Sequence, residues 1–127
     1  MNERFLSKAK TKNGEWVEGL VVGYTQGGLH TLRIQAINNT YYYFEIDPKT
    51  LCQCTGLKDK NGRLIFEGDI VEVFNTYENE IEVITEIIWG EDYPAFELKD
   101  TFFSECNNLS FIMAEDYTIE VIGNMHD

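Results

Sequence analysis

The chain has 127 residues and a formal net charge of −12, because 22 acidic residues stand against 10 basic ones. This negative surplus disfavours direct binding to nucleic-acid phosphates. With 43% hydrophobic and 13% aromatic residues, the chain can bury enough apolar surface to fold, which argues against disorder. Its apolar runs are too short for a membrane-spanning helix, and its first five residues have no signal-peptide pattern, so we expect a cytoplasmic protein.

Alternation of apolar and polar residues with period two dominates the chain and predicts half-buried antiparallel strands. In the segment 29–37, Leu32, Ile34 and Ala36 should share one face. In the segment 79–89, one face should carry Ile81, Val83, Ile87 and Trp89, and the opposite face Glu80, Glu82 and Glu86. The predicted strands lie near 4–11, 15–24, 29–37, 40–46, 64–66, 69–75, 80–89, 95–98 and 117–122.

Asn–Gly and Gly–Gly pairs interrupt this pattern and predict tight turns at 13–14, 27–28 and 61–62. The segment 101–113 has no clear period, and we expect a loop or a short helix there. Many short strands favour a mostly β fold of coiled antiparallel sheets with a barrel-like arrangement and few or short helices. We expect one domain over 1–127, with sub-lobes of about 1–47 and 48–127.

Three strings are the most distinctive part of the sequence. Residues 47–62 read DPKTLCQCTGLKDKNG, residues 65–71 read IFEGDIV, and residues 119–124 read IEVIGN. In this order they resemble the YopX family of bacteriophage and prophage proteins, and the resemblance covers most of the chain. It implies a β-rich fold of coiled sheets, an origin in a phage or prophage of a bacterial host, and no assigned activity.

The strings can also be interpreted from their residues. The run 57–62 predicts a hairpin loop in which Asp59 accepts hydrogen bonds from backbone amides and Gly62 takes a left-handed conformation. The run 67–71 predicts a turn that leads into a strand. Both patterns favour a role in specifying the fold over a role in binding.

Candidate metal ligands and nucleophiles are few. The thiols and imidazoles are Cys52, Cys54, Cys106, His30 and His126, and their separations do not fit a structural zinc site. No flanking motif supports a Cys–His catalytic pair, and no phosphate-binding glycine motif occurs. We therefore predict small, partly buried thiols, no catalytic, cofactor-binding or metal-binding residue, no cofactor, and a protein that is not an enzyme.

Glutamates at 78, 80, 82 and 86 form a possible acidic face (Glu78, Glu80, Glu82 and Glu86). The simplest interpretation is a solvated strand face that discourages edge-to-edge pairing. Two alternatives remain open: an array of charge that mimics nucleic-acid phosphates, and carboxylate ligands for a metal ion.

Four consecutive rings form a possible interface (Tyr41, Tyr42, Tyr43 and Phe44). On one strand they would point to both faces, so we expect one pair in the core and the other on a covering sheet or at a subunit interface. A base-stacking platform would need basic neighbours, which this run lacks.

These observations lead to three functional hypotheses. The first is a non-enzymatic phage accessory protein that binds an unknown protein partner or forms a homo-oligomer. The second is an acidic nucleic-acid mimic that inhibits a host DNA-binding enzyme, and the third is an enzyme with a carboxylate-bound metal.

Overall fold

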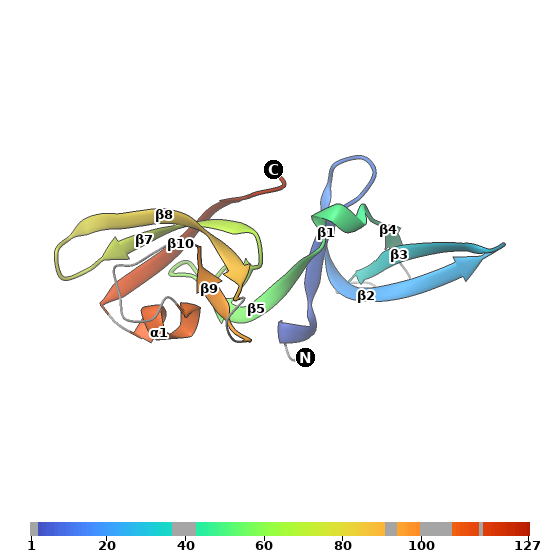
Figure 1. Cartoon of the computed structure of the whole chain (residues 1–127). Helices are drawn as coiled ribbons and strands as arrows, with labels where there is room; N and C mark the ends of the chain where they lie inside the picture. The colour runs from blue at the N-terminus through green and yellow to red at the C-terminus, as the bar shows by residue number, and fades with distance from the viewer. Residues whose placement is uncertain (1–2, 37–42, 91–93, 100–107, 115) are drawn as a thin grey trace. The chain divides into compact units, whose positions relative to one another are not determined.

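The computed structural model describes residues 3–36, 43–90, 94–99, 108–114 and 116–127 (Figure 1). Two compact units divide the chain at Met1–Gly56 and Leu57–Asp127. Within the described ranges, no helix is long and apolar enough to cross a membrane. In chain order the elements are η1 (Glu3–Phe5), β1 (Ser7–Lys10), β2 (Trp16–Gln26), β3 (Leu29–Ala36), β4 (Tyr43–Glu45), η2 (Pro48–Thr50), β5 (Cys52–Lys58), β6 (Leu64–Phe66), β7 (Asp69–Asn75), β8 (Glu80–Trp89), β9 (Phe96–Leu98), α1 (Leu109–Ala114) and β10 (Tyr117–Asn124).

The prediction of a mostly β protein with antiparallel sheets is confirmed. The helix α1 begins inside the segment where a loop or a short helix was expected. Among the described strands neither sheet closes on itself, so the predicted barrel-like closure is not confirmed. Strand β5 was missed, because its alternating Cys–Gln–Cys residues lack large apolar side chains, yet both cysteines are buried there.

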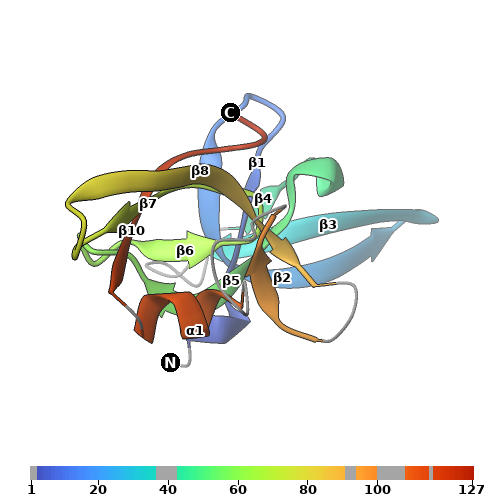
Figure 2. The same ribbon diagram turned by 60° about the vertical axis from the view of Figure 1, so that its left-hand side comes forward.

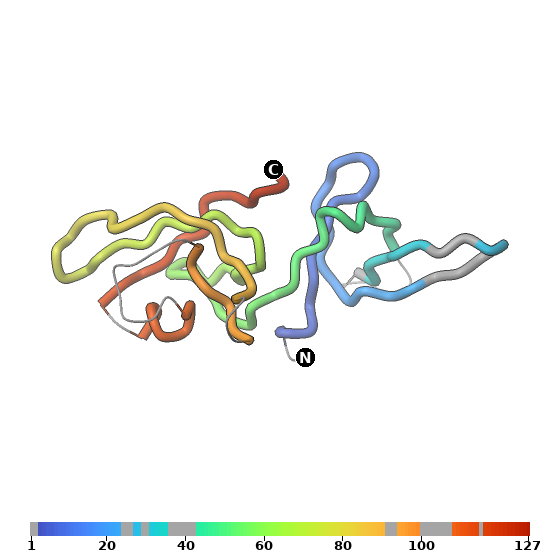
Figure 3. The backbone as a smooth tube through the Cα atoms, in the orientation of Figure 1, coloured from blue at the N-terminus to red at the C-terminus, as the bar shows by residue number. Residues whose placement is uncertain are grey.

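The first unit contains a sheet with the strand order β4-β3-β2-β1-β5. Strand β5 runs through the boundary between the units, and β6 pairs with it. Strands β2 and β3 form a long hairpin that turns at Gly27 and Gly28 (Figure 3), both with positive φ, as the sequence predicted. A small cluster of Ala9, Ile34 and Ile46 lies in the core of this unit, with Leu32 packed against it.

The second unit is built on a four-stranded sheet with the order β10-β7-β8-β9. One face of this sheet is covered by β6 and α1, which Figure 2 shows on the same side of β7, β8 and β10. The apolar side chains of that face and of its cover form the largest core cluster, which contains Ile65, Val71, Val73, Ile87, Leu98, Leu109, Ile112, Ile119 and Val121. The alternation predicted for 117–122 is confirmed, since Ile119 and Val121 are both buried.

The predicted apolar face of β8 is partly wrong. Ile87 is fully buried and Val83 packs against the core, but Ile81 and Trp89 are 53% and 46% exposed. The pairing of β7 with β8 shifts at Val73, so that Glu82 has no partner in the ladder. A bulge of this kind moves all residues beyond it to the other face, which explains Ile81. Trp89 lies at the strand end, where its ring meets the edge of Phe96 with 4.9 Å between centroids.

Candidate functional site

Of the four consecutive rings, the structure describes Tyr43 and Phe44, which lie on β4. Tyr41 and Tyr42 lie outside the described residues. Phe44 is opposite the buried Ile34 on β3, but it is still 38% exposed, and Tyr43 is 51% exposed. Tyr43 and Phe44 point to opposite faces of the strand, so each belongs to a different expected pair. Because both are exposed, the expectation that one pair is buried is wrong. The physical reason is position, because β4 is a three-residue strand at the end of its sheet order and no described strand pairs with its far side.

Three of the predicted acidic residues come together at the turn between β7 and β8. Carboxylate oxygens of Glu78, Glu80 and Glu82 all lie within 4.8 Å of one another. The sequence analysis expected Glu78 on a strand face, but in the structure Glu78 belongs to the turn before β8. Its backbone amide donates a hydrogen bond of 3.0 Å to the side chain of Asn75. Glu86 is separate, and its carboxylate lies 4.0 Å from the ammonium group of Lys99.

Repulsion within this cluster changes the proton affinity of one member. The pKa of Glu78 is raised, first because its protonated form donates a hydrogen bond to Glu80 and then because Glu80 is negatively charged, with a smaller contribution from Glu82. Three carboxylates could contact a hard cation such as Ca²⁺ or Mg²⁺. Both Glu78 and Glu80 are exposed at a hairpin turn, so solvent competes directly with any such ion.

The thiols of Cys52 and Cys54 were predicted to be partly buried, and the structure buries both residues almost completely, at 2% and 1% exposed. The thiol of Cys52 donates to the carbonyl of Thr50 at 3.3 Å, and the sulfur of Cys54 accepts the amide of Gly56 at 3.3 Å. Cys106 and the side chain of His30 lie outside the described residues. The two described thiols are therefore held by the local backbone of β5.

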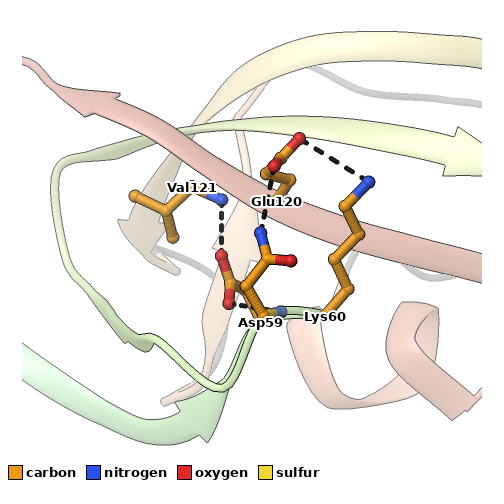
Figure 4. Close-up of polar contacts among 5 residues, drawn as sticks. Asp59, Lys60, Glu120 and Val121 are labelled. Carbon is orange, nitrogen blue, oxygen red and sulfur yellow. Dashed lines mark hydrogen bonds and ion pairs between the residues drawn. The ribbon is translucent and has the colours of Figure 1, made fainter.

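The loop 57–63 is fastened to β10 by its one buried carboxylate, Asp59 (Figure 4). One oxygen of Asp59 accepts the amides of Asn61 and Arg63, both at 2.9 Å, and the other accepts the amide of Val121 at 2.9 Å. Gly62 has a φ of 81°. The predicted hairpin loop, with its amide-binding aspartate and left-handed glycine, is confirmed.

The electrostatics of this contact follow from its geometry. Burial raises the pKa of Asp59, but hydrogen bonds from the amides of Val121, Arg63 and Asn61 outweigh it, so the pKa lies below its ordinary value of 3.8. On the outside of the same contact, Lys60 and Glu120 form an ion pair at 3.6 Å, drawn in Figure 4. The buried carboxylate and its exposed neighbours together hold the loop against the strand.

A second buried carboxylate, Asp69, joins the start of β7 to the end of β10. It is fully buried, accepts the amide of Phe66 at 2.8 Å, and accepts the side-chain amide of Asn124 at 2.9 Å. Gly68 before it has a φ of 85°, and its carbonyl accepts the amide of Met125 at 2.8 Å. Sequence reasoning predicted the turn but missed its partner, which lies 55 residues away.

The distinctive strings are thus parts of one structural arrangement, in which the loop 57–62 and the turn 67–71 both bind the strand 117–124. Comparison with family models finds a match to the model described as YopX protein, over residues 9–127. The chain belongs to the YopX family. Neither the comparison with curated proteins nor that with solved structures found a match. In this YopX protein, Asp59 and Asp69 join the strings to one another through hydrogen bonds, and the prediction that the strings specify the fold stays a prediction.

The first unit of this YopX protein contains an open cavity of about 800 Å³. Its walls carry charges of both signs, and one pair among them, Lys12 and Glu45, is already joined at 3.1 Å. The hydroxyl oxygen of Thr31 also lines the cavity, is shielded from solvent, and has no hydrogen-bond partner in the described structure. The cavity could accept a small molecule with polar groups, although no sequence motif pointed to it.

The second unit presents a surface that sequence reasoning missed. On the side of the sheet opposite the core, side chains of three strands share one face, here called the outer face: Ile70, Glu72, Phe74, Ile81, Ile84, Glu86, Thr118 and Glu120. Their common side follows from the ladder, because residues paired across antiparallel strands point the same way. Only the bulge in β8 brings Ile81 to this face, so a count of alternating residues could not have found it.

Proposed function

We propose that this YopX protein is a non-enzymatic accessory protein of a bacteriophage or prophage, which acts in the bacterial cytoplasm by binding another protein. The observation that carries this proposal is strand β4, whose two described rings are both exposed at an edge of the first sheet. An edge strand offers unpaired backbone groups, to which an extended segment can add as a further strand. Exposed Tyr and Phe side chains supply the apolar contact that such an interface needs.

Affinity capture from lysates of infected and uninfected host cells tests this function. The bait is the full chain, and the test variant is Tyr43→Ser combined with Phe44→Ser. Tyr77→Ser is the matched control, because Tyr77 is 86% exposed in a different unit. We expect a specific retained protein to disappear with the double variant and to remain with the control. Retention of the same proteins by all three baits would contradict the proposal.

Self-association through β4 is the second form of the same proposal. Two copies could pair their β4 strands antiparallel and bury the rings against each other. Sedimentation velocity over a wide concentration range distinguishes the forms. If the wild type is a dimer and the double variant is a monomer, the partner at β4 is a second copy of the chain. If the wild type is a monomer at every concentration, the partner is a different protein.

The carboxylate-metal alternative rests on the cluster of Glu78, Glu80 and Glu82 alone. A cation that binds the folded chain raises its melting temperature. A thermal scan with Mg²⁺, Mn²⁺ and Ca²⁺, repeated with Glu80→Gln, therefore tests it. A shift that depends on Glu80 would favour the metal hypothesis and weaken the proposal of a pure binding protein.

The nucleic-acid mimic has a narrower basis. Mimicry needs charges spaced along an elongated face. The predicted row of acids is divided in the structure, since three carboxylates gather at one turn and Glu86 lies near Lys99. We therefore rank protein binding through exposed apolar side chains above phosphate mimicry.

A further inference from the structure

No described residue of the second unit's cover, α1 and β6, packs on the other face of its sheet. The helix α1 and strand β6 both pack on the core side, and in Figure 1 α1 lies on one side of β7, β8 and β10. On the outer face Ile81 and Ile84 are 53% and 54% exposed, and Phe74, opposite Ile81 on β7, is half-buried. Two aliphatic side chains exposed to this degree next to a ring form an apolar patch in the middle of a sheet. Contact of this apolar surface with water is unfavourable, so covering it would lower the free energy.

Carboxylates surround this apolar patch. Glu72 is directly opposite Ile84 on one side and directly opposite Glu120 on the other, so two negative side chains face each other across neighbouring strands. Such like-charge pairs destabilise a sheet. Glu120 is partly neutralised by Lys60, whereas Glu72 makes no ion pair with any described base. Glu86, also on this face, lies near Lys99, so the outer face combines exposed aliphatic carbon with one carboxylate, that of Glu72, which no described base balances.

We propose that the outer face binds a cationic amphipathic segment of a partner protein, in which arginine or lysine side chains flank apolar ones. The apolar side chains would cover Ile81 and Ile84, and the bases would lie between Glu72 and Glu120, where two carboxylates can share them. This inference rests on the proposed function as a protein-binding module and names the chemistry of the partner. A second copy of the chain fits this face poorly, because its own outer face would bring more glutamates against Glu72.

Synthetic peptides of about 10 residues, the length of a long strand, test the inference. One peptide alternates arginine and leucine, a second alternates arginine and serine, and a third alternates glutamate and leucine. The probe is added to the ¹⁵N-labelled full chain, and amide chemical shifts are recorded. We expect only the arginine–leucine peptide to saturate, with shifts concentrated on β7, β8 and β10 around Glu72 and Ile84.

Variants locate the binding on this face. Glu72→Arg combined with Glu120→Arg should weaken the arginine–leucine peptide at least about tenfold, because attraction becomes repulsion. Glu15→Arg combined with Glu18→Arg changes the net charge equally on exposed positions of the first unit, and should alter affinity no more than about twofold. Ile84→Ser should also weaken binding, and since Ile84 is exposed, its amide spectrum should otherwise stay native.

Several outcomes would overturn the inference, and they separate it from the proposed function. Shifts centred on β4 would move the interface to the aromatic edge and leave the proposed function intact. Equal binding of the arginine–serine peptide would show that charge alone acts. A dimer that Ile84→Asp dissociates would make a second copy the occupant. Absence of saturation with all peptides refutes the outer face, while loss of lysate capture with the β4 variant still supports the proposed function.

Discussion

The two units stabilise antiparallel sheets in different ways. The second unit covers one sheet face with a strand and a helix, and it adds two buried carboxylates that tie a loop and a turn to β10. The first unit has the smaller apolar cluster, a long hairpin and an exposed three-residue edge strand. The difference teaches that a small sheet gains stability from a covering layer and buried polar contacts, and that a sheet without them leaves its edge strand exposed.

The largest effect should come from removing the Asp59 carboxylate. Asp59→Ala leaves the amides of Val121, Asn61 and Arg63 without their acceptor, and we expect a loss of about 4 kcal/mol in the free energy of unfolding. Urea denaturation measures it. Trp89 lies in the second unit and Trp16 in the first, so a Trp16→Phe background lets fluorescence follow the second unit alone.

Lys60→Ala is the control for that experiment. It removes only the exposed ion pair to Glu120 and should cost about 0.5 kcal/mol or less. If both variants lose the same free energy of unfolding, the buried carboxylate of Asp59 does not hold the loop. Buried polar contacts would then not distinguish the second unit from the first.

A matched pair of core truncations compares the units directly. Ile87→Ala should cost about 4 kcal/mol and Ile34→Ala about 2 kcal/mol, because the described cluster around Ile87 has nine buried members and that around Ile34 has three. Both side chains are fully buried, so exposure does not differ. Urea titration of each variant gives the two values, and a larger loss for Ile34 would reverse the comparison.

Acid should weaken the second unit through Asp59. Its pKa is lower in the folded chain than in the unfolded one, so its contribution to stability is present above the unfolded value of 3.8. That contribution is lost as the pH falls from there through the folded pKa. Unfolding free energies of the wild type and Asp59→Ala, measured from pH 6 to about pH 2, should converge toward the acid end. Parallel curves would show that Asp59 does not titrate differently on folding.

The smallest effect concerns the acidic turn between β7 and β8. Glu80→Gln removes the charge next to Glu78, whose pKa is raised, and should increase the melting temperature slightly at neutral pH. Because a raised acid pKa means a stability contribution that is lost as the pH rises, the gain should shrink in mild acid. Melting curves of the wild type and Glu80→Gln at neutral pH and in mild acid measure this. A lower melting temperature of the variant at neutral pH would mean that the charge of Glu80 makes a favourable interaction.

Sequence reasoning succeeded where the interacting residues are close in the chain and failed where they are distant. Turns such as 27–28 and the loop of Asp59 were predicted because their glycines and the aspartate act on amides a few residues away. Glu78 was assigned to a strand face although it lies in the turn before β8. The side to which Ile81 points was also predicted wrongly, because the register shift in β8 leaves no local mark in the sequence. Strand β5 was missed for a similar reason, since only its burial between neighbours distinguishes it from a loop.

By itself, the sequence determined the mostly β class, the alternation of β10 and the family, because side-chain period and local turn chemistry are properties of consecutive residues. The tertiary structure alone decided which carboxylates are buried, that β4 is an edge with both rings exposed, and that Ile81 and Ile84 share a face with Glu72. These features depend on strand order and register, which are set by contacts between residues distant in the chain.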